Sequence, residues 1–342
     1  MSTVEARVLE PGDYERWSAF VRAAPSGSAY SLPAYLEALC KANGDRFEVL
    51  GALRGDELVG GIAVYERRSA LGPFVGPYLL LYYNGFVLRE YETRYPSERA
   101  ARQAAVLAAL GDALADKGYG RLEVRSRGPV ADLRPLLARG WDAIPSYTYV
   151  VQLADLDAQW HRVEQNQRRL IERARQQGLT VTDDGDFDAF FSLHTRTVER
   201  KGALLHLPRD PFRRFYDDLR ASGLCRLFEA RLADGRLAAA QLVLLGHPVT
   251  HTVTAAADQE LQSTGANPFL RWSVFERLAA EGYAANDLTD AMNPQVARFK
   301  AQLGGELELF LAARHPGSLR FRTAYRAREL AARARAVRER PS

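Results

Sequence analysis

Hydrophobic and polar positions follow two patterns in this chain, and both patterns occur twice in the same order. Amphipathic helical regions come first, as in "DYERWSAFVRAAP" and "DFDAFFSLHTRTVERKG". Two apolar strands around a polar turn follow each of them, as "FEVLGALRGDELVGGIAVYE" and "RLFEARLADGRLAAAQLVLL". A helix, a strand, a short helix and a last strand complete each half. The pattern predicts a mixed α/β protein in which helices cover a central sheet.

A constant offset relates the later parts of the two halves. The segment "LADKGYGRLEV" begins at Leu114 and "LAAEGYAANDL" begins at Leu278, so the offset is 278 − 114 = 164 residues. The same offset pairs Gly140 with Gly304, each at the end of a short predicted helix. Upstream, the elements recur in the same order with a different offset. We therefore expect two copies of one unit of roughly 150 residues, a common domain size.

The second copy departs from the first at a position that should be buried. Val296, Phe299, Lys300 and Leu303 fall at i, i+3, i+4 and i+7, which is the inward stripe of a short helix. The residue that matches Lys300 in the first copy is Leu136 (300 − 164 = 136). A buried lysine costs free energy unless it is paired or hydrated. Lys300 is therefore expected either to reach solvent at the helix edge or to face an anionic ligand in a cleft.

Charge adds a third segment to this picture. The 342 residues are 47% hydrophobic and 26% charged, which is typical of a globular chain long enough for two domains. The net charge is +4, but residues 314–342 hold nine arginines and two glutamates, so residues 1–313 sum to 4 − 7 = −3. This arginine- and alanine-rich segment predicts a helix, either solvated and docked or acting as an arm for RNA or an anionic surface. The expected parts are domains over residues 1–153 and 154–315 and a basic C-terminal helix over residues 316–342.

Other features of the sequence argue against secretion, membrane insertion and metal binding. The start "MSTVEARVLEPGD" lacks the apolar region of a signal peptide, and the longest apolar run, "YLLLYY", is too short to cross a bilayer. Cys40 and Cys225 have no metal-ligand spacing and are expected to be free thiols. These features favour a cytoplasmic protein without a metal site, and they leave the oligomeric state open.

Four segments of the second half resemble a known family in their order and content. They are "NQRRLIERARQQGLTV", "LHTRTVERKG", "STGANPFLRWSVFERLAAEGY" and "NPQVARFKAQLGG". Together, from about Trp160 to Phe310, they resemble the Fem family of non-ribosomal peptidyl transferases. The resemblance implies two tandem GNAT-like domains with mixed central sheets, and an enzyme that moves an aminoacyl group from aminoacyl-tRNA to the peptide of a peptidoglycan precursor. It also implies that Lys300 meets a substrate phosphate between the domains. Leu39 departs from the family, which often has a basic residue there.

Most of the residues expected to carry the chemistry lie in the second half. Asp290 follows a predicted strand and is the candidate general base, and Lys300 is the candidate catalytic cation. Gly265, Ala266 and Asn267 open a helix whose N–H groups attract an anion or an acyl oxygen. The other candidate substrate-binding residues are Asn166, Arg168, Arg169, Arg200, Lys201, Tyr82 and Tyr83. Each of these also fits a structural role on a solvated helix face, at a helix C-terminus or in the core.

The sequence leaves the acyl donor open, and no bound cofactor is expected. GNAT acetyltransferases bind the pyrophosphate of coenzyme A with the pattern Q/R-x-x-G-x-G/A; Gln262 and Gly265 fit it, and Asn267 does not. The first interpretation is therefore an aminoacyl-tRNA-dependent transferase whose basic C-terminal helix binds tRNA and whose acceptor is a peptide or small molecule. The second is an N-acyltransferase that uses acyl-CoA or an acyl carrier protein on an amino acid or small amine. The third is a GNAT-fold protein that binds RNA or a partner without catalysis.

Overall fold

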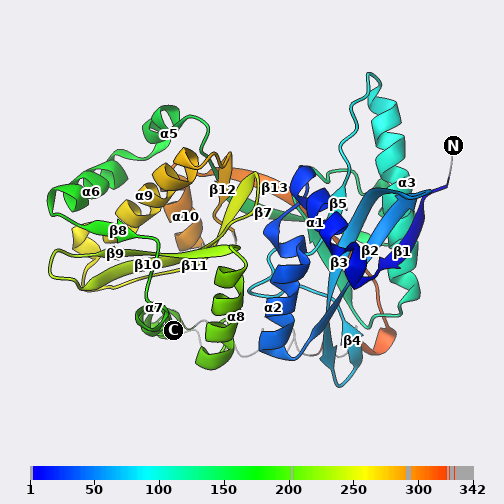
Figure 1. Cartoon of the computed structure of the whole chain (residues 1–342), viewed down its shortest axis with the longest axis horizontal. Helices are drawn as coiled ribbons and strands as arrows, with labels where there is room; N and C mark the ends of the chain where they lie inside the picture. Colours follow the sequence, from blue (N-terminus) through cyan, green and yellow to red (C-terminus); the bar gives the residue numbers. More distant parts are fainter. Residues whose placement is uncertain are drawn as a thin grey trace. The chain divides into compact units, whose positions relative to one another are not determined.

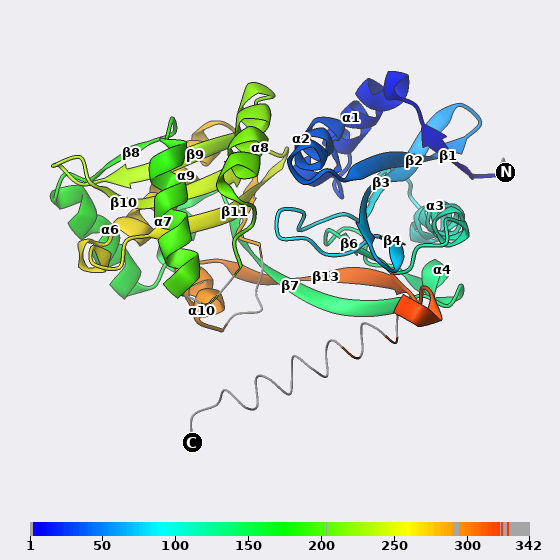
Figure 2. The same cartoon turned by 90° about the horizontal axis from the view of Figure 1, so that it is seen from below.

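The structure is a computed structural model of the chain, and it describes residues 3–200, 202, 204–289, 294–321, 323 and 327. Contacts divide it into two compact units, and the path of the chain through both can be followed in Figures 1 and 2. Unit 1 comprises Met1–Ser26, Asp45–Pro145 and Leu311–Ser342, and unit 2 comprises Gly27–Gly44 and Ser146–Phe310. Each unit contains both helices and sheet strands, as the sequence predicts.

Unit 1 is built on an antiparallel sheet covered by helices. Its strand order is β1-β2-β3-β4, with β5 also paired to β3. β3 is buried on both faces, because Gly60 lies against Val106 of α3 and Gly61 against Trp17 of α1, where a Cβ atom would collide. The elements are β1 (Glu5–Leu9), α1 (Tyr14–Ala23), β2 (Arg46–Arg54), β3 (Glu57–Ser69), β4 (Gly72–Phe74), β5 (Phe86–Leu88), α3 (Pro96–Asp116), β6 (Leu122–Ser126) and α4 (Arg134–Leu137).

Unit 2 has a longer sheet with helices on both faces. The strand order is β7-β12-β11-β10-β9-β8, in which β11 and β12 are parallel and the other pairs are antiparallel. Figure 1 shows α6 and α9 on one face of β8–β11, and α7 and α8 on the other. The elements are α2 (Pro33–Asn43), α5 (Leu156–Arg162), α6 (Gln165–Gln176), β8 (Thr180–Thr182), α7 (Phe187–Arg200), α8 (Arg209–Ala221), β9 (Cys225–Arg231), β10 (Leu237–Leu244), β11 (Val249–Ala257), α9 (Ala266–Ala280), β12 (Ala285–Asp287) and α10 (Pro294–Gln302). Two further strands belong to both units: β7 (Asp142–Gln152) begins in unit 1, and β13 (Glu306–His315) ends there.

The two copies exchange their last strands. β7 ends the first copy but pairs with β12 of the second copy, where Asp287 faces Val150. β13 ends the second copy but pairs with β6 of the first copy, where Glu123 faces Arg314. Both pairings obey the repeat, since 287 − 123 = 164 and 314 − 150 = 164. In each pairing, the last strand of one copy is thus hydrogen-bonded to a strand of the other copy.

Backbone geometry confirms the predicted repeat. Gly140 and Gly304 both have left-handed backbones, with φ of 79° and 81°. In the first copy the N–H of Trp141 donates to the carbonyl oxygen of Leu136 at 3.1 Å, and in the second the N–H of Gly305 donates to that of Lys300 at 3.1 Å. The two helix ends therefore close in the same way, 164 residues apart.

The observed units differ from the expected boundaries of residues 1–153 and 154–315 at two places. Gly27–Gly44 belongs to unit 2, because α2 packs against α8: the rings of Tyr35 and Phe215 meet edge to face at 5.6 Å, and Lys41 Nζ lies 3.5 Å from Asp218 Oδ2. Leu311–Ser342 belongs to unit 1, because the second half of β13 pairs with β6. Neither contact is visible in the periodicity of the chain, since both join segments far apart in sequence.

The expected basic helix over residues 316–342 lies mostly outside the described residues. Its described start is helical from Leu319 and packs on unit 1. The N–H of Ser318 donates to the carbonyl oxygen of Gly120 at 3.2 Å, and the ring of Phe321 lies 5.8 Å from that of Phe74. The root of the basic segment is thus anchored on unit 1.

Candidate functional site

Strand β12 pairs in parallel with β11 over a short stretch of unit 2 and then ends. The two strands pair only at Val249–Ala285, Thr250–Asn286 and His251–Asp287, and β11 then continues to Ala257. β11 also carries an extra residue, Val253, because Thr252 and Thr254 lie opposite the adjacent residues Val243 and Leu242 of β10. Bulges of this kind redirect a strand and are frequent beside active sites. The place where β12 ends at Asp287 and β11 continues, called the divergence below, is the point to which the polar residues converge.

A buried carboxylate ends β12 at this divergence. Asp287 is 2% exposed, and its Oδ1 accepts hydrogen bonds from Thr148 Oγ1 at 2.5 Å and from the N–H of Thr289 at 2.7 Å. His251 Nδ1 lies 3.7 Å from its Oδ2. Thr289 has a left-handed backbone, with φ of 53°, which is unusual for a β-branched residue. Asp287 therefore holds a strained turn in place.

Lys300 is fixed by the same turn. It is 8% exposed, and its Nζ donates a hydrogen bond to the carbonyl oxygen of Thr289 at 2.5 Å. The hydroxyl of Thr289 in turn donates to the carbonyl oxygen of Thr252 at 3.0 Å, at the start of the bulge. A chain of contacts thus leads from β11 through Thr289 to the lysine. Lys300 occupies the buried stripe of α10, as its spacing predicts, and its ammonium is directed to the end of β12.

The other face of the divergence is also polar. The side-chain amide of Asn286 donates to Thr250 Oγ1 at 2.7 Å, and its carbonyl oxygen accepts from Thr252 Oγ1 at 2.9 Å. Asn286 and Thr250 are fully buried. Two adjacent residues of β12, Asn286 and Asp287, therefore supply polar groups to opposite faces of the sheet.

The predicted anion cradle at the start of α9 has a clear packing role. Gly265 has a φ of 76°, and a Cβ atom there would collide with the carbonyl oxygen of Leu170 in α6. The N–H of Ala266 lies 3.3 Å from Thr264 Oγ1, and that of Phe269 donates to the carbonyl oxygen of Gly265 at 3.0 Å. Substrate binding by Gly265, Ala266 and Asn267 stays a prediction.

The remaining predicted site residues lie on several separate elements. Asn166, Arg168 and Arg169 are in α6, and the side chain of Asn166 accepts from the N–H of Gln167. Arg200 ends α7 and donates to Gln259 Oε1 at 2.8 Å. Tyr82 and Tyr83 belong to unit 1, where their rings meet edge to face at 4.9 Å. Asp290 and Lys201 lie outside the described residues.

Sequence reasoning missed the residues that surround Lys300. Asp287 sits three residues before Asp290, and its position as the last residue of a buried strand could have marked it. His251 and Thr289 carry no motif, and their proximity follows from the pairing of β11 with β12. Only Lys300 was recognisable beforehand, because the repeat supplies an apolar counterpart for it.

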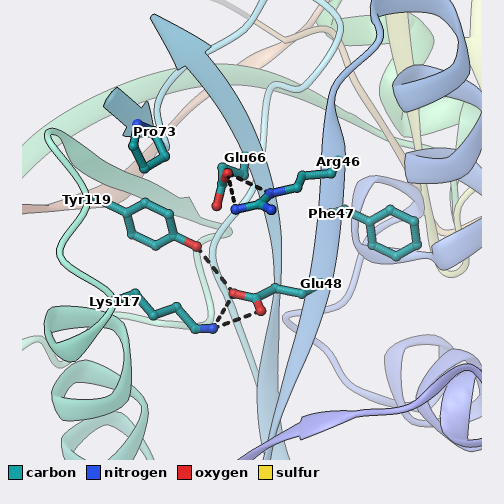
Figure 3. Close-up of a pocket in the computed structure, with 7 residues that line it drawn as sticks. All are labelled: Arg46, Phe47, Glu48, Glu66, Pro73, Lys117 and Tyr119. Carbon is teal, nitrogen blue, oxygen red and sulfur yellow. Dashed lines mark hydrogen bonds and ion pairs between the residues drawn. The ribbon is translucent and has the colours of Figure 1, made fainter. Parts of the chain in front are cut away.

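Unit 1 contains a pocket of about 370 Å³, shown in Figure 3. Its charged groups neutralise one another: Arg46 pairs with Glu66 at 2.6 Å, and Lys117 pairs with Glu48 at 2.6 Å. Burial, together with Glu48 and Glu66, raises the pKa of Tyr119 above its usual range, and its hydroxyl donates to Glu48 at 3.2 Å. The charges sum to zero and each is paired. The pocket contains none of the predicted site residues.

Two kinds of feature are absent from the described part of the chain. No three His, Cys, Asp or Glu side chains gather there as metal ligands. None of the helices described is both long enough and apolar enough to cross a membrane.

Comparisons with known proteins place this site within a known fold. Residues 161–301 match the family model described as an acetyltransferase (GNAT) domain. The crystal structure of FemX is similar with a TM-score of 0.71 at 14% identity, covering 90% of this chain and 96% of that one. The C-terminal domain of a putative lysylphosphatidylglycerol synthetase from Agrobacterium fabrum has a TM-score of 0.57 at 13% identity, covering 90% and 92%. A tandem GNAT protein from the clavulanic acid biosynthesis pathway has a TM-score of 0.51 at 15% identity, covering 92% and 100%. No curated protein matches the chain in sequence.

These similarities confirm the predicted fold of two tandem GNAT-like copies with mixed sheets. The matched residues 161–301 span α6 to α10, so the match to a GNAT acetyltransferase domain lies in the second copy. The divergence of β11 and β12 and the buried Lys300 both lie inside this domain.

Proposed function

We propose that this chain is an amide-forming transferase that moves an aminoacyl group from aminoacyl-tRNA to an amine of a peptide or peptidoglycan-precursor-type acceptor. The observation that carries the proposal is the buried ammonium of Lys300, directed to the end of β12 inside the GNAT domain. A cation buried away from water interacts strongly with an anionic substrate or with charge that develops during reaction.

The reaction sets three requirements. The acceptor amine attacks the ester carbonyl carbon, so that a C–N bond forms and the bond to the terminal ribose oxygen of the tRNA breaks. The amine gives up a proton, and the leaving oxygen takes one. Lys300 would neutralise either the donor phosphate or the developing oxyanion. Asp290 is the candidate proton acceptor, and Asp287 and Thr289 would position Lys300.

Hydrogen bonding at the start of α9 favours this donor over acyl-CoA. Among the first four residues of α9, the N–H groups of Ala266 and Phe269 have hydrogen-bond partners inside unit 2. Pro268 has no N–H group. Only the N–H of Asn267 is left to face a pyrophosphate, whereas GNAT enzymes that use coenzyme A bind it at this place. The similarity to FemX and to the putative lysylphosphatidylglycerol synthetase domain also supports an aminoacyl group as cargo.

A transfer assay with both donors tests the proposal. The full chain would be given aminoacyl-tRNA or acyl-CoA, each with a panel of peptide and amino-sugar-peptide amines, and amide products would be detected by mass spectrometry. We expect amide product from aminoacyl-tRNA that falls with Lys300→Leu and persists with Lys117→Leu, since Lys117 lies in unit 1 and pairs with Glu48. Product from acyl-CoA alone would replace the proposal with the second interpretation.

The acyl-CoA alternative rests on the family match, which is to an acetyltransferase domain. In that case the acceptor would be an amino acid or other small amine. Binding of RNA without product from either donor would instead indicate a non-catalytic GNAT-fold protein.

A further inference from the structure

Gln241 is a buried amide without a visible partner. It is 0% exposed, and neither its Oε1 nor its Nε2 has a hydrogen-bond partner among the described residues. It lies in the middle of β10, opposite Phe228 of β9 and Ala255 of β11. An amide in this state costs free energy, because burial removes its bonds to water.

The strand register shows which face of the sheet Gln241 occupies. Residues directly opposite one another in antiparallel strands share a face. Phe228 and Ala230 belong to the core cluster that includes Phe275 and Leu278 of α9. Gln241 therefore points into the layer between the sheet and α9.

Arg271 is a half-buried arginine on the helix side of that layer. It lies in the second turn of α9. Val274, Phe275 and Leu278 follow it by three, four and seven residues, so they lie on the same face of the helix, and all three are 0% exposed. Its Nε is buried without a partner, and no carboxylate of the described residues forms an ion pair with its guanidinium. Burial lowers its pKa to about 10, so it remains a cation at neutral pH.

Because of the direction of α9, Arg271 and Gln241 lie at a similar height along the strands. α9 connects the parallel strands β11 and β12, so it runs back antiparallel to β11. Arg271 lies five residues after Ala266, about 7.5 Å along the helix. Ala255, the residue opposite Gln241, lies two residues before Ala257, about 7 Å along the strand. Ala266 and Ala257 both contact the same core cluster at this end of the unit.

We propose that Arg271 and Gln241 together bind an oxyanion of the substrate, a carboxylate or a phosphate, in the layer between α9 and the sheet. A guanidinium and a side-chain amide N–H group both donate hydrogen bonds that such an anion accepts. The anion would accept hydrogen bonds from Arg271 Nε and Gln241 Nε2, and it would pair with the charge of the guanidinium. Carboxylate would come from the acyl group or the acceptor, and phosphate from the donor. This site rests on the proposed function only in assigning the anion to the substrate of the transferase.

Anion binding by the full chain tests the proposal without any need for activity. Thermal unfolding would be followed while inorganic phosphate, pyrophosphate or glutarate is added at constant ionic strength. We expect one of these probes to raise the unfolding temperature with saturation, by about 3 °C at ten times its dissociation constant. A response to phosphate or pyrophosphate would point to the donor, and a response to glutarate would point to a carboxylate. Absence of a saturable response to all three would refute the site.

Two variants and a control separate binding from a structural role. Arg271→Met and Gln241→Leu should each abolish the response and leave the unliganded protein as stable as the parent, because each removes a buried polar atom that has no hydrogen-bond partner. Arg277→Met, in the same helix but paired with Asp183 at 3.1 Å, should keep the response. Lower stability of the first two variants together with an unchanged response would show that both groups are structural. If the protein binds the anion but does not transfer an aminoacyl group, the proposed function alone is refuted. If it transfers an aminoacyl group but shows no anion binding that depends on Arg271, this site alone is refuted.

Discussion

Replacing Lys300 with leucine restores the residue that the first copy of the repeat uses. Leu136 is 0% exposed in the core of unit 1, so the helix accepts leucine at this position. The substitution removes the hydrogen bond from Nζ to the carbonyl oxygen of Thr289, which is worth about 1.5–3 kcal/mol when the donor is charged. It also removes a buried ammonium, which costs several kcal/mol to desolvate. The two effects oppose each other, so the free energy of unfolding should change by no more than about 1 kcal/mol.

Activity should respond differently. If the ammonium neutralises substrate charge, losing a contact of about 1.5–3 kcal/mol lowers kcat/KM roughly ten- to hundredfold. Lys300→Arg should restore only part of this, because a planar guanidinium does not replace a compact ammonium. The assay needs urea unfolding and aminoacyl transfer on the same preparations, with Lys117→Leu as the control. Full activity per folded molecule, with a stability loss of several kcal/mol, would show that Lys300 is structural.

The other predictions concern the turn, a buried histidine, the start of α9 and the basic segment. Asp287→Asn should lower kcat/KM about tenfold, because a neutral amide holds the turn less firmly; unchanged kinetics would refute its positioning role. Burial lowers the pKa of His206 to about 4, so between pH 6.5 and 4 the unfolded chain binds a proton that the folded chain does not, and the free energy of unfolding should fall with falling pH by up to about 3 kcal/mol. His206→Phe should remove that dependence in urea titrations across this range. Gly265→Ala should destabilise the fold by at least about 2 kcal/mol, and Gly282→Ala, which has an equally left-handed backbone but open space, by about 1 kcal/mol; equal losses would contradict the close packing of α9 on α6. Deleting residues 328–342 removes five arginines and should weaken RNA binding. The slope of the logarithm of the binding constant against the logarithm of the salt concentration should become shallower by about 0.9 for each lost phosphate contact. An unchanged slope would exclude the segment from RNA binding.

Local signals in the sequence predicted the repeat and its turns. Gly140 and Gly304 could be recognised because a helix that ends in a left-handed residue favours glycine there. Lys300 could be recognised because one cation interrupts an apolar stripe. These features depend only on residues within a few positions of one another.

Long-range pairing could not be predicted in the same way. β7 and β13 have equivalent positions in the repeat, so their patterns fit either sheet, and only tertiary packing selects the exchanged partners. The same limit applies to α2, whose apolar face carries no sign that it packs on α8. Gln241 and Arg271 were missed because an isolated polar residue in a strand or helix becomes informative only when its burial and its partners are known.

The exchanged strands explain why chemistry is expected in one copy and not in the other. Asp287 of the second copy corresponds to Glu123 of the first (287 − 164 = 123), and both carboxylates are buried. Burial raises the pKa of Glu123, but hydrogen bonds and charge from Arg121 and Arg314 lower it further, to below its usual range. Arg314 comes from the exchanged strand β13, whereas the equivalent residue of β7 beside Asp287 is Val150. One carboxylate is thus neutralised by arginines, and the other is held by a hydroxyl and a backbone N–H, with a buried lysine on the same turn. Because the same exchange delivers an arginine to one copy and a valine to the other, Glu123 is fixed by arginines in unit 1, and we propose that the polar groups around Asp287 in unit 2 serve a substrate.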